Sequence, residues 1–202
     1  QIKFLLRKRK TNKNIAAKQF PKKKSLLKEF LNSFPFELTK SQLKVLNEIK
    51  KDLSNQAPMS RLLQGDVGSG KTIIAIASLL IVIEKNLQGA FMVPTEVLAE
   101  QHYKSLLKYL NPLLVSVELL TGNTPQKKRR EILSNLKNGL VDILVGTHAL
   151  FEDKVIFNSL GIVVIDEQHR FGVTQRNRLL NKGDNTNLLS MTATPIPRTL
   201  AL

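Results

Sequence analysis

The sequence predicts an α/β fold in which a mostly parallel β-sheet carries helices on both faces. Short, nearly continuous apolar runs alternate with helical segments along the chain, a pattern typical of parallel strands that are buried on both sides. A glycine-rich phosphate-binding motif stands between one such run and a helical segment. Polar motifs follow the ends of the apolar runs, as expected where a ligand binds at the carboxyl edge of such a sheet.

The predicted elements of this fold begin at Thr39. An amphipathic helix is expected after it, because Thr39 is a suitable capping residue and Leu43, Leu46, Ile49 and Leu53 recur on one side of the helix. The later apolar runs predict strands, and the segments between them favour helices. The strands are expected at RLLQ, GAFMVP, VSVELL, VDILVG, IVVID and NLLSMTAT, and the helices over 71–86, 95–110 and 125–138.

The stretch GDVGSGKT, residues 65–72, matches the phosphate-binding pattern G-x-x-x-x-G-K-[ST] at every fixed position. Its glycines allow backbone geometries in which successive N–H groups turn toward phosphate oxygens. Lys71 supplies a positive charge, Thr72 offers a hydroxyl to a Mg²⁺ ion, and the following helix points its positive end at the same anion. The candidate nucleotide-binding residues are Gly65, Asp66, Val67, Gly68, Ser69, Gly70, Lys71 and Thr72.

The run IVVIDEQHRFG, residues 162–172, ends a buried-looking strand in two adjacent acids. On its own, a strand that surfaces into a polar turn explains it equally well. The phosphate-binding motif upstream favours a strand that delivers paired acids to a nucleotide and its metal. Asp166 is then expected to hold Mg²⁺ through water, and Glu167 to orient and deprotonate the water that attacks the γ-phosphate. We therefore expect ATP and Mg²⁺ as ligands, with Lys71 and Glu167 as catalytic residues.

Length and composition limit the class of protein. The chain has 202 residues, of which 42% are hydrophobic, which is enough for one well-buried domain and an appendage. The absence of cysteine excludes disulfides and thiolate zinc sites, and it agrees with a reducing compartment. No apolar run reaches the roughly 18 residues that span a bilayer, so we expect a cytoplasmic protein without a membrane partner. The first residue is not Met and the sequence stops at TLAL, which suggests a piece of a longer protein.

The positive charge is concentrated at the N-terminus. The net charge is +15, and residues 1–30 hold eleven Lys or Arg against the single acid Glu29, a balance of +10, which leaves +5 for residues 31–202. Residues 1–34 are therefore interpreted as a basic connector that contains helical pieces. Such a run is explained by a solvated linker or by contact with a polyanion, above all DNA phosphate, and the sequence leaves both open.

From about Phe36 to Leu202 these motifs resemble, in order and spacing, the superfamily 2 helicases and translocases. FELTKSQ resembles the adenine-recognising Q motif, PTEVLAEQHY motif Ia, LLTG motif Ib, DEQH motif II and TAT motif III, and GTHAL resembles a further strand-end motif. The strings QGDVGSGKT, VGTHAL, DEQHRFGV and MTATPIPRTLAL resemble in particular the RecG family of branched-DNA helicases. The transcription-repair coupling factors are the nearest alternative, but they usually have Lys where Ala149 stands and Glu where Gln168 stands.

The resemblance implies a RecA-like P-loop NTPase fold and roles for several further residues. Gln42 would read the adenine edge and Phe36 would pack near the base, although a plain helix-surface glutamine would explain Gln42 without the resemblance. His169 would couple motif II to motif III around Thr192 and Thr194. A metal-ligand role for His169 is not expected, because no second His or Cys stands at ligand spacing.

Six residues at strand ends are candidates for DNA contact. Backbone N–H groups at a helix N-terminus and a nearby hydroxyl can hold a DNA phosphate. A plain helix cap explains Thr95 equally well. With the resemblance added, we expect DNA contacts from Thr95, Glu96, Thr121, Gly122, Thr147 and His148.

The resemblance also implies partners. A motor of this type closes against a second RecA-like domain that contributes arginines to the phosphates, and a wedge domain binds the junction. We accordingly expect residues 1–34 to be the connector from a wedge domain and residues 35–202 to be the first RecA-like domain. The expected function is ATP-driven remodelling of branched DNA, such as replication forks and Holliday junctions, in recombination and repair. The alternative for the isolated chain is a nucleotide- or DNA-binding module without turnover.

Overall fold

The computed structural model describes residues 25–193, apart from the side chain of His169. Its centre is one six-stranded sheet in the order β1-β6-β5-β2-β4-β3, in which every neighbouring pair is parallel. The strands are β1 (Ser60–Gln64), β2 (Gln88–Met92), β3 (Val117–Leu120), β4 (Ile143–Gly146), β5 (Leu160–Ile165) and β6 (Asn187–Thr192). The expected parallel α/β fold is confirmed.

Both faces of the sheet are buried because successive side chains of a strand point to opposite faces. In β5, Ile162 and Val164 belong to one hydrophobic cluster, while Val163 and Ile165 belong to the other. All four side chains are fully buried. This explains why the sequence shows nearly continuous apolar runs rather than an alternation of apolar and polar residues.

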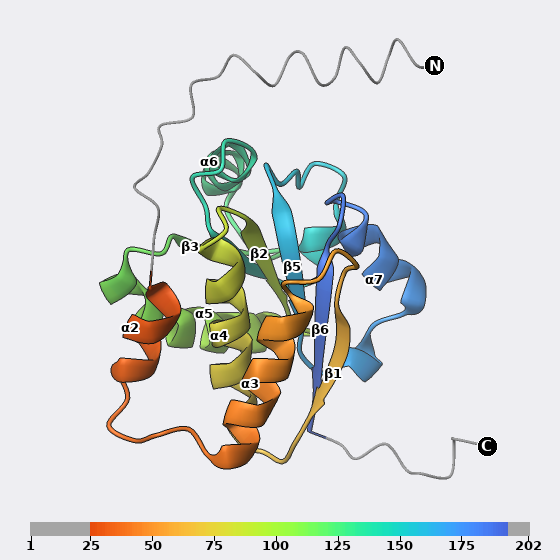
Figure 1. Cartoon of the computed structure of the whole chain (residues 1–202). Coiled ribbons are helices and arrows are strands. Elements are labelled where there is room, and N and C mark those ends of the chain that lie inside the picture. Colours follow the sequence, from red (N-terminus) through yellow and green to blue (C-terminus); the bar gives the residue numbers. More distant parts are fainter. Residues whose placement is uncertain (1–24, 194–202) are drawn as a thin grey trace, which may run out of the picture.

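The helices divide between the two faces. In Figure 1 the sheet lies between a group formed by α2, α3 and α4 and, on the other side, α7. The first hydrophobic cluster also includes buried residues of α5, whereas the second includes those of α6, α7 and the 3₁₀ helix η2. The helices are α2 (Leu26–Asn32), α3 (Lys40–Asp52), α4 (Lys71–Ile83), α5 (Glu96–Leu110), α6 (Gln126–Lys137) and α7 (Val173–Leu180), with η1 (Asn111–Leu113), η2 (His148–Phe151) and η3 (Gln168–Arg170).

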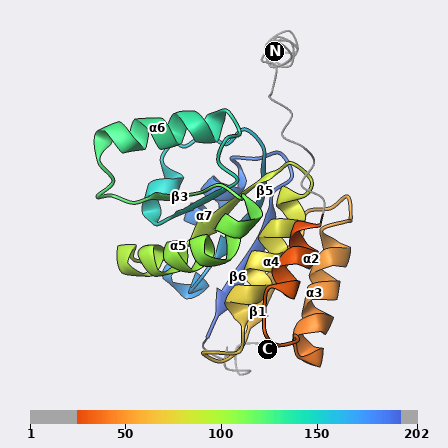
Figure 2. The same ribbon diagram turned by 90° about the vertical axis from the view of Figure 1, so that its left-hand side faces the viewer.

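The last part of the segment expected to be a basic connector packs on this domain. Helices α2, α3 and α4 lie side by side in both ribbon views (Figures 1 and 2). Phe30 on α2 is fully buried in the first cluster, and the carboxylate of Glu84, just after α4, accepts a hydrogen bond from the Leu27 N–H (3.0 Å). Residues 1–24, which hold ten of the eleven N-terminal Lys and Arg, lie outside the described residues.

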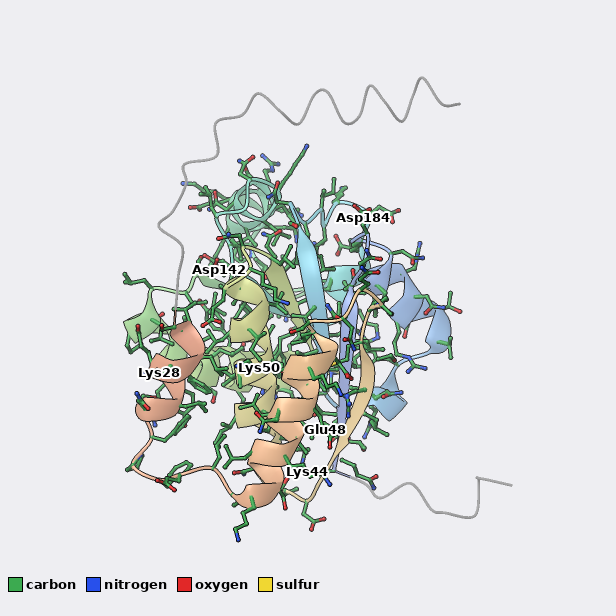
Figure 3. All side chains as sticks on the ribbon, viewed as in Figure 1. Lys28, Lys44, Glu48, Lys50, Asp142 and Asp184 are labelled. Carbon is green, nitrogen blue, oxygen red and sulfur yellow. The ribbon has the colours of Figure 1, made fainter. Side chains whose placement is uncertain are left out.

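Helix α3 begins as expected with Thr39 as its cap, and Leu46, Ile49 and Leu53 are buried. The periodicity places Leu43 on the same side, but Leu43 is 45% exposed, because it stands at the edge of the apolar side and lines an open groove with Lys44 and Asn47. At the other end, Arg61 of β1 donates to Glu48 (2.8 Å), labelled in Figure 3, and to Asp52 (2.5 Å). The hydrogen bond from Arg61 lowers the pKa of the Asp52 carboxyl below its ordinary value.

Other elements differ in part from the expected ones. Helix α4 ends at Ile83 rather than near residue 86, and four of the six strands are one or two residues shorter than the apolar runs that predict them. No sequence pattern indicates α7 or the three short 3₁₀ helices. Within the described range 25–193, none of the helices has the length and apolar character needed to cross a membrane.

Candidate nucleotide and DNA sites

The phosphate-binding motif forms the turn between β1 and α4. Gly68 and Gly70 have φ angles of 81° and 86°, in the left-handed region that side chains disfavour, and Gly70 is the N-cap of α4. The Lys71 ammonium donates to the carbonyl oxygens of Gly65 (2.5 Å) and Asp66 (2.8 Å). The first N–H groups of a helix have no partner within that helix, so those of α4 are available to an anion. This is the geometry expected of a phosphate-binding loop.

Gln42 connects helix α3 to this loop. Its backbone N–H donates to the Thr39 hydroxyl (3.2 Å) and its side-chain oxygen accepts from the Thr39 N–H (2.9 Å), which completes a capping box. Its side-chain amide donates to the Ser69 carbonyl (2.9 Å). A Cβ atom at Gly70 would clash with the same amide. Gln42 therefore lies against the nucleotide-binding loop, which a glutamine on a free helix surface would not do.

Phe36, the other candidate for the base, is about half exposed. Its ring lies on that of Phe34, with the centroids 5.2 Å apart. Phe34 in turn packs against Phe30 and Tyr109. The aromatic group gives Phe36 a fixed support and leaves part of its surface open to solvent.

The two acids follow β5 directly. The Asp166 N–H continues the sheet pattern by donating to the Met92 carbonyl (2.9 Å), and its Oδ1 accepts from the Glu167 N–H (3.0 Å). Glu167 has φ 52° and ψ 53°, a left-handed conformation that costs a non-glycine residue about 1–3 kcal/mol. The chain therefore turns sharply at the second acid, directly after Asp166.

His102 is a member of this site that the sequence analysis did not identify. Its Nε2 lies 3.0 Å from Asp166 Oδ2, and both side chains are mostly buried. The ring also packs on Phe91 of β2, with the centroids 4.8 Å apart. His102 belongs to α5, whose N-terminus carries the candidate DNA residues Thr95 and Glu96. One helix thus contacts the acid pair and also forms part of the expected DNA surface.

Motif III lies beside the nucleotide loop. Strand β6 stands between β1 and β5, and the Gly65 N–H donates to the Thr192 carbonyl (3.4 Å). The short helix η3, which contains His169, packs against β6. This arrangement agrees with a link between motifs II and III, although the side chain of His169 and the whole of Thr194 lie outside the described part of the chain.

The candidate DNA residues lie at the carboxyl ends of β2, β3 and β4, which occupy the other half of the sheet. The Thr95 hydroxyl accepts from the Leu98 N–H (3.3 Å), so Thr95 does cap α5. Thr121 and Thr147 are buried, whereas Gly122 and His148 next to them are exposed. A DNA strand would therefore meet main-chain atoms and exposed neighbours before the two threonine hydroxyls.

The loop after β4 also contacts motif II. The ring of His148 lies 5.6 Å from that of Phe171, which follows η3. At the far end of η2, the Lys182 ammonium donates to the carbonyls of Glu152 (2.7 Å) and Val155 (2.9 Å). Burial lowers the pKa of Lys182 below its ordinary value. The contact of His148 with Phe171 thus links the loop after β4 to the segment that follows the acid pair.

A family model described as DEAD/DEAH box helicase matches residues 39–202, which include every candidate site residue except Phe36. The chain belongs to the DEAD/DEAH box helicase family. Members of this family use ATP, which agrees with the loop geometry around Lys71.

Among the relatives of this helicase chain are proteins named ATP-dependent DNA helicase RecG. The one from Synechocystis is 52% identical over all 202 residues, and the one from Bacillus subtilis is 55% identical over 176 residues. The chain spans 24% and 26% of the length of these two relatives, about a quarter. The expected similarity to the RecG family is confirmed.

Solved structures give the same result for the fold. A structure of RecG bound to a three-way DNA junction matches 88% of this chain with a TM-score of 0.79 and 47% identity, and the match covers 24% of that protein. The Lhr helicase of Mycobacterium smegmatis, bound to single-stranded DNA and AMP-PNP, matches 87% of this chain and 25% of its own with a TM-score of 0.66 at 21% identity, which shows the fold alone. The fold is therefore the RecA-like helicase fold.

Proposed function

We propose that this chain is the ATP-binding motor domain of a helicase that remodels branched DNA. The observation that carries the proposal is the order of strands at one sheet edge. The nucleotide loop, motif III and the acid pair follow β1, β6 and β5, and the three candidate DNA loops follow the adjoining strands β2, β4 and β3. Nucleotide and DNA would then bind side by side on one rigid scaffold.

In this proposal the turn before α4 binds the triphosphate. Lys71 exchanges its two loop carbonyls for phosphate oxygens, and the glycines bring backbone N–H groups close to the same oxygens. Gln42 and Phe36 hold the adenine from the side of α3. A Mg²⁺ ion, held by Thr72 and Asp166, would neutralise charge on the phosphates.

Glu167 is proposed as the general base. Its left-handed backbone turns the chain directly after Asp166. One acid would then serve the metal, and the other would accept a proton from the attacking water. Thr192, Thr194 and His169 would transmit the state of this site along β6. The chemistry requires only that water be oriented and deprotonated while the phosphates are held.

The DNA contacts are proposed at Thr95, Glu96, Thr121, Gly122, Thr147 and His148. Contacts through backbone N–H groups read no sequence, which suits a motor that moves along any strand. Branched DNA is proposed as the substrate because the relatives at about half identity are named RecG, and one of them was solved on a three-way junction. Ala149 and Gln168 favour this assignment over a translocase of the transcription-repair coupling type.

The proposal includes further domains. Since the chain spans about a quarter of its RecG relatives, we propose that residues 35–202 are the first RecA-like domain and that residues 1–34 connect it to a wedge domain. A second RecA-like domain would complete the ATP site. The motor would act in the cytoplasm, where ATP and DNA are both available, and the lack of cysteine agrees with a reducing compartment.

The test is the Lys71→Ala variant of the full-length protein. It removes the charge at the phosphates and two hydrogen bonds within the loop, and ATP-driven unwinding of a labelled three-way junction should be abolished. Circular dichroism should show an unchanged fold, and the exposed Lys44→Ala variant should unwind normally. Unimpaired unwinding by Lys71→Ala would refute the assignment.

A further inference from the structure

Hydrogen bonds from two charged side chains connect the three candidate DNA loops to one another. The first is Glu96, in the opening turn of α5, after β2. Its carboxylate accepts a hydrogen bond from the Asn123 N–H (3.3 Å) and another from the Asn123 side-chain amide. Asn123 belongs to the loop after β3, and β4 lies between β2 and β3 in the sheet. Glu96 therefore spans the position of an intervening strand.

Gly122 allows this close approach. A Cβ atom at Gly122 would lie 3.1 Å from Glu96 Oε1, closer than side chains normally pack. Next to it, the Thr121 N–H donates to the Thr124 hydroxyl (2.9 Å), so the loop also has its own internal support. The carboxylate of Glu96 is thus turned toward the loop.

Arg129 of α6 connects the third loop, the one after β4, to the loop after β3. Its guanidinium donates to both carboxylate oxygens of Glu152 (2.9 and 2.8 Å) and to the Thr121 carbonyl (2.9 Å). Glu152 directly follows η2, which begins with His148 after β4. The Arg129 side chain is only 14% exposed, whereas that of Glu152 is 44% exposed, so water reaches this ion pair from the Glu152 side. Arg129 therefore connects the loop after β3 with the segment that follows β4.

We propose that Glu96 and Arg129 are positioning residues that hold the three loops as one preformed surface for a DNA backbone. The inference rests on the proposed function, in which these loops bind DNA. It adds that Glu96 has two separate roles. Its backbone N–H faces the phosphate as part of the α5 N-terminus, while its carboxylate fixes the neighbouring loop. Loops that are already ordered lose less conformational freedom on binding. These hydrogen bonds therefore raise DNA affinity although they make no contact with the DNA.

The direction in which DNA affinity changes when the Glu96 carboxylate is removed distinguishes a positioning residue from an acid that is merely exposed. A carboxylate beside a polyanion repels it, so removing a merely exposed acid should tighten DNA binding or leave it unchanged. If Glu96 positions the loop, Glu96→Ala should weaken binding despite the lost negative charge, by about fivefold for the loss of one net hydrogen bond. Glu96→Gln keeps an acceptor oxygen and should bind at least as tightly as the unmutated chain.

The experiment measures the affinity of the 202-residue chain for a fluorescein-labelled three-way junction by anisotropy. Asn123→Ala should weaken binding like Glu96→Ala, and the double variant should be no weaker than either, because both remove the same contact. Glu100→Ala, which removes an exposed acid from the same helix, should not weaken binding. Binding of a fluorescent ATP analogue should be equal in all variants, which a general loss of structure would not allow.

Each outcome decides between the two levels of the proposal. DNA binding by Glu96→Ala that equals or exceeds that of the unmutated chain would overturn the positioning role alone. Additive losses in the double variant would do the same. An unmutated chain with no affinity for the junction would overturn the proposed function of the three loops and this inference with it.

Discussion

Asp166 and Glu167 are neighbours in the chain, but the structure gives them different surroundings. Asp166 is held by His102 and by the Glu167 N–H, with its backbone still bonded to β2. Glu167 stands in a left-handed turn. In the proposed mechanism the held acid binds the metal, and its neighbour in the turn accepts the proton of the attacking water.

At this scale we predict that Glu167→Gln in the full-length protein preserves ATP binding and lowers the hydrolysis rate at least ~100-fold. The amide keeps the shape of the side chain and loses the base. Equilibrium binding of a fluorescent ATP analogue and steady-state hydrolysis measure the two quantities separately. Loss of binding in this variant would show that Glu167 has a structural role instead.

His102 leads to a second prediction at the same scale. Partners of metal-binding carboxylates typically contribute about 10–100-fold to metal affinity or activity. We expect His102→Ala to raise the Mg²⁺ concentration needed for half-maximal hydrolysis by about tenfold, and His102→Gln, which can still donate to Asp166 Oδ2, to restore most of it. The concentration of Mg²⁺ needed for binding of a fluorescent ATP analogue should shift in parallel. An unchanged Mg²⁺ dependence in both assays would contradict the role.

Some of these residues can be predicted from sequence, and others cannot for a physical reason. Lys71, Asp166 and Glu167 can be identified because a phosphate-binding turn and a strand-end acid pair are local patterns. His102 and Asn123 cannot, because their contacts join segments 64 and 27 residues apart and depend on how α5 lies across the sheet. For Thr95 the sequence allows a helix cap or a DNA contact, and its hydroxyl does cap the helix.

Among the elements, helices α2 and α7 are the ones whose bounds cannot be predicted from sequence periodicity. Both are short, with seven and eight residues, so their periodicity covers about two turns. The basic composition around α2 leaves a solvated linker and a polyanion contact open, whereas Leu26 and Phe30 are buried against the domain. The longer helices α3, α4, α5 and α6 are all predicted, with ends within three residues of the observed ones.

The element-scale prediction concerns α2. Phe30 is fully buried between α2 and the domain, so Phe30→Ala should lower the free energy of unfolding by about 3 kcal/mol, mostly through the cavity it leaves. Phe36→Ala is the matched control, since Phe36 is about half exposed and should cost less than about 1 kcal/mol. Urea denaturation followed by circular dichroism measures both. Equal stabilities would mean that α2 does not contribute to the folded domain in solution.

At the scale of the whole molecule, the order of strands creates the site. The sequence predicts six parallel strands with polar motifs at their ends, but local patterns carry no information on the order of those strands in the sheet. That order depends on which crossovers pack best in three dimensions, and it places motif III between the nucleotide loop and the acid pair. It also gathers the three candidate DNA loops at one side, where Glu96 and Arg129 can join them.

The same arrangement predicts that this chain is only part of a catalytic unit. The loop at 65–72 and the acid pair lie on one side of the proposed triphosphate, whereas phosphoryl transfer also needs positive charge on the far side. Arg170 follows the acid pair on η3 within the same domain and is not expected to reach across the nucleotide. An arginine from a second RecA-like domain would supply that charge.

The most direct test of the account compares ATP hydrolysis by residues 1–202 with that of the full-length protein, both with saturating three-way-junction DNA. We predict DNA-stimulated turnover by the full-length protein and a rate near background for the chain alone, since an arginine contributed across the site is worth about 10³–10⁵ in rate. Stimulated turnover by residues 1–202 close to that of the full-length protein would contradict the account, because the catalytic set would then be complete within this chain.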